Sequence, residues 1–70
     1  MNQEKLVAKE LNQMINEDKI PLSITEDVHE ICRSLISGEM KVSELQDKDS
    51  FIVSAVQQAM SRIDTKNSQN

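Results

Sequence analysis

The sequence predicts a small all-α protein, a bundle of three helices with a possible short fourth, completed or stabilised by homodimerisation. Apolar residues recur at spacings of three and four in three segments, and the single proline and the single glycine mark the ends of the first two segments. Strand-like alternation never extends beyond a few residues. At 70 residues the chain is one domain, whose core supplies only about 3–5 kcal/mol of stability, so self-association is expected.

The first helix is predicted from about Asn2 to Glu17. Asn2 can accept hydrogen bonds from the free amides of the first turn, and Glu4 suits the positive end of the helix dipole. The apolar stripe consists of Leu6, Val7, Leu11, Met14 and Ile15. We therefore expect this stripe to be buried and the opposite, polar face to be solvated.

A connector and a second helix come next. Pro21 prevents continuation of the first helix, and the apolar residues near it predict a connector that lies against the core. The second helix begins at Ser23, as a capping box with Glu26, or at Thr25, and it ends at Gly38 in a left-handed conformation. The connector's apolar residues are Ile20, Leu22 and Ile24, and the second stripe is Val28, Ile31, Cys32, Leu35 and Ile36.

The remainder has a weaker pattern and then a third helix. A short helical turn is predicted at residues 43–46, and Asp49 or Ser50 caps the last helix. One face of that helix holds Ile52, Val56, Ala59, Met60 and Ile63, with Phe51 and Ala55 beside it. Residues 1–63 are thus predicted to form the single domain, and residues 64–70 a polar, disordered tail.

Composition restricts the classes of function. Twelve acidic side chains against eight basic ones give a net charge of −4, and the chain has one aromatic residue, Phe51. Binding to phosphates or to unstacked bases is therefore disfavoured. The N-terminus lacks the basic and apolar regions of a signal peptide, and the longest apolar run is far shorter than a membrane span, so a cytoplasmic location without membrane contact is expected.

Few residues could carry chemistry, and we expect no enzyme activity, no cofactor and no metal site. His29 and Cys32 are three residues apart on a helix, but Cys32 belongs to the apolar stripe and is expected to be inert. The segment from Asp47 to Asp49 resembles the start of a calcium loop, but Ile52 stands where that loop requires glycine. The carboxylate clusters are expected to cap helices and to keep the protein soluble.

One segment resembles the helix-turn-helix of winged-helix bacterial repressors: residues 35–45, with their Val-Ser-Glu-Leu run, followed by residues 52–63. The resemblance implies a recognition helix whose Ser54, Gln57, Gln58 and Ser61 face the DNA, with Arg62 and Lys66 near phosphates. Gln46, Asp49 and Ser50 depart from the pattern, and no wing hairpin follows. In layout alone, the chain is also similar to small bacterial helical proteins of the YejL type, which favours a helical dimer.

The sequence favours a small, acidic, non-enzymatic interaction or regulatory module that docks a helix face on a protein partner. Val7, Leu11 and Met14 are the predicted interface, because an amphipathic first helix can pack on a second protein or a second copy. The alternative is a small DNA-binding regulator that uses Ser54, Gln57, Gln58, Ser61 and Arg62. A bacterial or phage accessory protein fits the composition.

Overall fold

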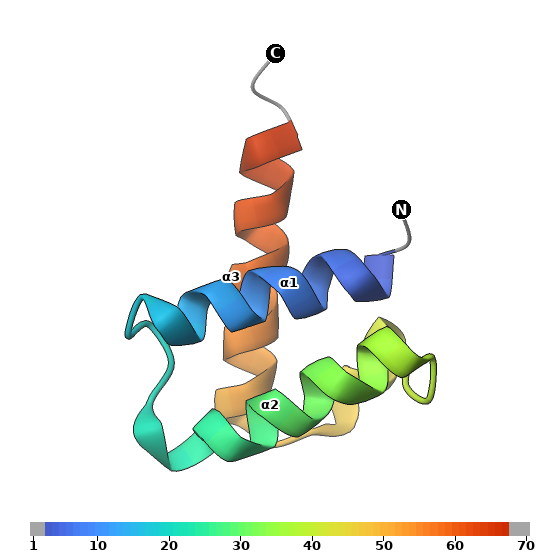
Figure 1. Cartoon of the computed structure of the whole chain (residues 1–70), viewed down its shortest axis with the longest axis horizontal. Coiled ribbons are helices and arrows are strands. Elements are labelled where there is room, and N and C mark those ends of the chain that lie inside the picture. The colour runs from blue at the N-terminus through green and yellow to red at the C-terminus, as the bar shows by residue number, and fades with distance from the viewer. Residues whose placement is uncertain (1–2, 68–70) are drawn as a thin grey trace.

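The structure, a computed structural model, describes residues 3–67 and is all-α, as predicted (Figure 1). Three α-helices and one 3-10 helix make it up: α1 (Gln3–Asn16), α2 (Leu22–Ser37), η1 (Val42–Asp47) and α3 (Ser50–Asn67). The predicted short fourth helix is therefore the 3-10 helix η1. The expected N-cap Asn2 lies outside the described residues.

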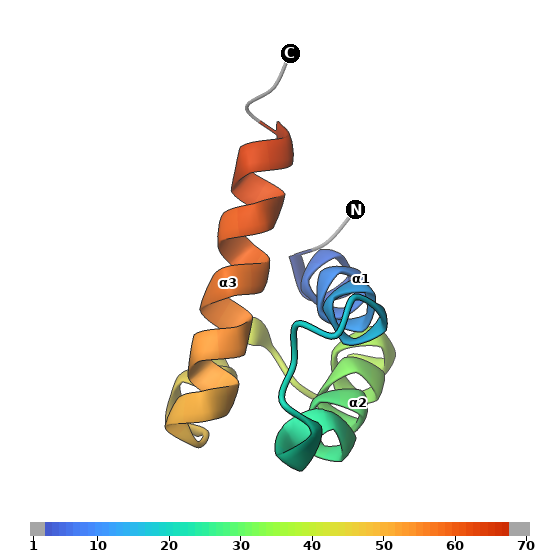
Figure 2. The same ribbon diagram turned by 90° about the vertical axis from the view of Figure 1, so that its left-hand side faces the viewer.

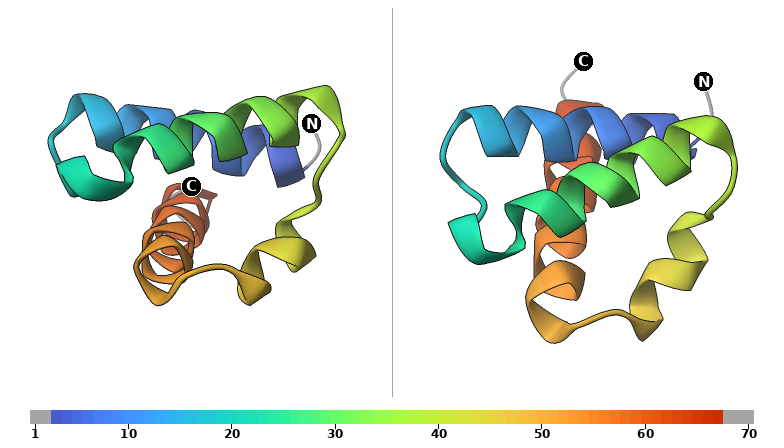
Figure 3. Two further views of the ribbon diagram at one scale, coloured as in Figure 1. Left: turned by 90° about the horizontal axis from the view of Figure 1, so that it is seen from below. Right: turned by 60° about the horizontal axis from the view of Figure 1, so that its bottom comes forward.

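The helix α1 is central to the packing. It lies antiparallel to α2, and α3 runs across the back of this pair, so α1 contacts both other helices while α2 and α3 touch each other little (Figures 1 and 2). The 3-10 helix η1 spans the distance from the end of α2 to the start of α3 (Figure 3). The C-terminal turns of α3 project beyond α1.

The core is formed by the predicted stripes. Its largest fully buried side chains are Leu11, Met14, Leu35, Leu45, Val7 and Val28. Ile20 of the connector is buried as expected, but Leu22, the first residue of α2, is 91% exposed. Ile36, Phe51 and Met60 are also more exposed than their stripes predicted, at 57%, 66% and 36%.

The start of α2 differs from both predictions. The helix begins at Leu22 directly after Pro21, and neither Ser23 nor Thr25 caps it. Pro21 has an extended backbone at ψ 140°, and its carbonyl accepts hydrogen bonds from the Ile24 amide at 3.1 Å and the Thr25 hydroxyl at 3.0 Å. Thr25 thus uses its hydroxyl as a donor inside the helix, and Pro21, which has no amide hydrogen to donate, stands at the boundary just before the first turn.

The end of α2 is as predicted, with Gly38 in the left-handed conformation at φ 87°. We expect Gly38→Ala to lower the free energy of unfolding by about 1 kcal/mol, because a side chain disfavours positive φ. A Cβ there would meet no atom within 4 Å, so the loss would come from the backbone alone. Urea unfolding followed by far-UV circular dichroism measures this free energy, and a Gly38→Asn control should lower it less. An alanine variant as stable as wild type would contradict this helix end.

Side chains of α1, of η1 and of the connection before α3 fix the starts of η1 and α3. The Glu44 carboxylate accepts a hydrogen bond from the Lys41 amide at 2.9 Å, and the Glu4 carboxylate accepts one from the Val42 amide at 3.2 Å. Asp49, one of the two predicted caps, accepts a hydrogen bond from the Phe51 amide at 2.8 Å. The short helix is therefore tied to α1 at its first residue.

The last helix is longer than predicted. It continues through Asn67, so residues 64–67 of the expected disordered tail are helical, and residues 68–70 lie outside the described part. Two contacts stabilise the extra turn: the Thr65 hydroxyl donates to the Ser61 carbonyl at 3.0 Å, and the Lys66 ammonium donates to Glu10 at 2.8 Å. The second contact is tertiary, which is why the local pattern did not indicate it.

Candidate docking surfaces

The predicted interface residues belong to the core of the protomer. Val7 and Leu11 are 0% exposed and Met14 is 1% exposed, because α1 is covered by α2 on one side and α3 on the other. In this fold no partner can reach these three side chains. A docking surface has to be built from other residues.

The buried carboxylate of Glu10 joins α1 to the end of α3. Its side chain is 6% exposed, Lys66 Nζ lies 2.8 Å from Oε1, and Arg62 Nε lies 3.0 Å from Oε2. The Arg62 contact is electrostatic, because Oε2 accepts no well-directed hydrogen bond within the described residues. Sequence reasoning missed Glu10, although it lies three residues after Val7 and four before Met14 on the buried stripe.

Arg62 also pairs with Glu17. Its Nη2 atom lies 3.0 Å from Oε1 of Glu17, and Gln13 donates to the same carboxylate at 3.1 Å. The hydrogen bond from Arg62, and then that from Gln13, lowers the pKa of Glu17, while the bond to Glu17 raises the pKa of Arg62. A lowered pKa means that the pair stabilises the fold at neutral pH and that this contribution is lost as the pH falls through that pKa.

These pairings leave the outer face of α1 basic. Glu10 is buried against α3, and Glu4 is half-buried with its carboxylate on the Val42 amide. Lys5 and Lys9 are exposed on the side of α1 that faces away from α3. A protein of net charge −4 thus presents cations on one helix face because both acids of that helix are used internally.

A groove of about 730 Å³ runs between α1 and α2 on this basic side. Its floor contains the buried Ala8 and Cys32 and, at one end, the exposed Ile36. Its other lining residues are Lys5, Lys9, Asn12, His29 and Arg33. Apolar surface below and cations along the rim define this α1–α2 groove.

The candidate chemical pair, His29 and Cys32, lies in the same groove. His29 is exposed, and Cys32 is 6% exposed with its thiol donating to the Ala8 carbonyl at 3.4 Å. Burial raises the pKa of the Cys32 thiol, which keeps it protonated at neutral pH. Within residues 3–67, no three His, Cys, Asp or Glu side chains are grouped so that they could hold a metal ion.

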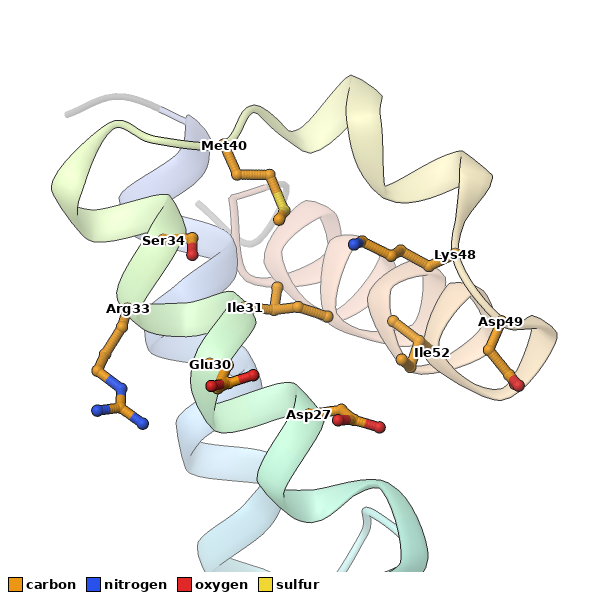
Figure 4. A pocket seen from close by; sticks show the side chains of 9 residues that line it. All are labelled: Asp27, Glu30, Ile31, Arg33, Ser34, Met40, Lys48, Asp49 and Ile52. Atoms are coloured by element: carbon orange, nitrogen blue, oxygen red, sulfur yellow. The ribbon is translucent and has the colours of Figure 1, made fainter.

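A second hollow, of about 540 Å³, lies between α2 and the start of α3 (Figure 4). Ile31 and Ile52 form its apolar part, and Lys48 reaches across it toward Met40, whereas Arg33 points away. Its charged side chains, from α2 and from the connection before α3, do not converge on one point, and Asp49 is already engaged as the cap of α3. This hollow offers less of a binding site than the α1–α2 groove.

The residues proposed for DNA contact all lie on α3 but do not form one free face. Ser54, Gln57, Gln58 and Ser61 are exposed, while Arg62 is paired with Glu10 and Glu17. Gln57 borders η1, whereas Gln58 lies on the side of Glu17 and Lys19. The segment that resembles the first helix of a helix-turn-helix is the 3-10 helix η1.

Fold and surfaces define a small helical protein with an apolar groove rimmed by cations. None of the described helices is both long and apolar enough to cross a membrane. The chain belongs to the YgzA protein family, whose family model matches residues 1–63. It is 31% identical over 64 residues to the uncharacterized protein YgzA of Bacillus subtilis (strain 168), covering 91% of this chain and 96% of the relative. No solved structure gave a significant match.

Proposed function

We propose that this chain is a non-enzymatic docking module that binds an acidic amphipathic segment of a protein partner in the α1–α2 groove. The observation that carries the proposal is the lining of the groove. Lys9 and Arg33 stand along an apolar floor, and no acidic residue of the described chain lines it. An amphipathic helix docks by burying its apolar side chains in such a groove, and its flanking carboxylates would meet the cations.

The cations along the groove affect the orientation and the association rate of the partner more than its affinity. Lys9 and Arg33 come from the two opposite walls, so an acidic helix between them would be attracted from both sides. Rim cations of this kind raise the association rate with an acidic partner and reject basic surfaces, because like charges repel each other. Ile36, exposed at the end of the groove, supplies an apolar contact for the partner.

The non-enzymatic part of the proposal rests on the same groove. Its thiol, that of Cys32, is buried, hydrogen-bonded to the Ala8 carbonyl and kept protonated by its raised pKa. An activated cysteine needs the opposite, an exposed thiol with a lowered pKa. The cytoplasmic location and a regulatory role stay predictions from the sequence.

A selection experiment tests the docking function without knowledge of the partner. A randomised library of helical peptides is displayed and selected on the immobilised chain, and the enriched peptides are sequenced. We expect enrichment of amphipathic sequences with Asp and Glu beside an apolar stripe. A Lys9→Glu/Arg33→Glu variant should bind these peptides at least about tenfold more weakly, which corresponds to about 1.4 kcal/mol.

Lys41→Glu and Lys48→Glu together provide the matched control, since both lysines lie outside the groove. Equal loss of binding in this control would show that net charge, not the groove, attracts the peptides. Enrichment of basic or uncharged peptides would overturn the proposal. Salt-sensitive binding of duplex DNA that is lost on Gln57→Ala/Gln58→Ala substitution would favour the DNA-binding alternative.

A further inference from the structure

A second surface, on the side of α3 next to η1, holds apolar side chains that the fold covers only in part. Met60 stands between two hollows: one lies against the start of α1, with Leu6 and Ile63, and one lies against η1, with Val53 and Gln57. Leu6, Val53 and Ile63 are half-buried, and Met60 is 36% exposed. These five residues define the Met60 surface, which follows one face of α3 for about 15 Å at 1.5 Å per residue.

The Met60 surface is nearly free of charge. Among the described residues that line its two hollows, Asp64 at one end is the only charged one, and Gln3, Gln46, Gln57 and Ser61 supply neutral polar groups. The other hollows differ in this respect. The α1–α2 groove carries three cations, and the hollow beyond Gln58 is lined by Glu17, Lys19 and Arg62.

We propose that the Met60 surface binds a second copy of this chain about a two-fold axis. In a two-fold contact the same patch lies on both proteins. A patch with charges of one sign would therefore repel the identical patch of the copy, whereas an apolar strip with neutral edges can pack against its own copy. Because two protomers of net charge −4 repel each other overall, contact is favoured where neither presents charge.

The contact with the copy would lie on the part of α3 that borders α1 and η1. The C-terminal turns of α3 project beyond α1 (Figures 1 and 2). A stable contact needs about 800 Å² from each protein. The total surface is 4928 Å², so a contact of this size would cover about a sixth of it. The dimer would supply the stabilisation that the chain lacks in disulfides, since its one cysteine is free.

Neighbouring glutamines on α3 allow a matched test. Gln57 lies on the Met60 surface, and Gln58 lines the hollow on the Glu17 side; both are exposed. Light scattering over a concentration series, with refractive-index detection, gives the dimer dissociation constant. We expect Gln57→Glu to raise it about tenfold or more, because each copy gains a carboxylate inside the contact. Gln58→Glu, the same change one residue on, should alter it less than twofold.

Dilution of the isotope-labelled wild type locates the surface without any substitution. From millimolar to low micromolar concentration, the amide resonances of Leu6, Gln57 and Met60 should shift, and those of Lys9 and Arg33 in the α1–α2 groove should not. A wild type that stays monomeric at millimolar concentration would overturn the proposal. So would a dimer that Gln57→Glu and Gln58→Glu weaken equally, or shifts confined to the groove.

Discussion

Leu11→Ala is expected to leave most of the protein unfolded at 37 °C. Leu11 is 0% exposed at the middle of α1, the helix that contacts both α2 and α3. Truncating a leucine at such a position costs about 2–5 kcal/mol, and a core of this size provides only about 3–5 kcal/mol in total. Far-UV circular dichroism with urea measures the loss, and it suits a chain without Trp or Tyr.

Leu22→Ala is the matched control, because the side chain is chemically identical but 91% exposed. We expect it to change the free energy of unfolding by less than about 0.5 kcal/mol, as is usual for surface substitutions. If both variants lost the same small amount, α1 would not be the helix around which the core is built. If Leu22→Ala were the more harmful, that side chain would have to be covered by another molecule.

Periodicity predicted the helices well because each stripe reports which side of its helix is buried. The stripe of α1 and the glycine that ends α2 were both placed correctly, since a local pattern determines them. The start of α2 and the end of α3 were not. Pro21 displaced two good capping residues, and the last turn of α3 is held by Lys66 on Glu10, 56 positions away in the sequence.

The candidate site was harder to predict than the helices. An apolar stripe that is buried inside the protomer cannot also contact a partner. We expected Val7, Leu11 and Met14 to contact a partner, but they are buried in the core of the protomer. The α1–α2 groove depends on how α1 is rotated, which decides that Glu10 faces α3 while Lys9 faces outward. Net charge averages over such differences, so the sequence indicated an acidic protein without showing that one of its grooves is basic.

Glu10→Gln is the second change with a large expected effect. Removing one member of a fully buried ion pair costs about 3–5 kcal/mol, because the charge left behind has no partner. Here the carboxylate is 6% exposed but its partners Arg62 and Lys66 are 30% and 54% exposed, so both cations can turn toward water. We therefore expect a smaller loss of about 1–2 kcal/mol, and a midpoint lowered by about 4–8 °C for each kcal/mol.

The dependence of stability on salt concentration distinguishes the contact of Arg62 with the buried Glu10 from its contact with Glu17 at the surface. The distance beyond which ions screen exposed charges falls from about 10 Å at 0.1 M salt to about 3 Å at 1 M, but ions reach a carboxylate enclosed between α1 and α3 poorly. The effect of Glu10→Gln should therefore persist at high salt, whereas the smaller effect of Glu17→Gln should disappear. Glu26→Gln, at an exposed position of α2, is the neutral control. If Glu10→Gln were as harmless as this control, the contact with Arg62 and Lys66 would only offset the cost of burying the carboxylate, and α1 would be held to α3 by its apolar stripe alone.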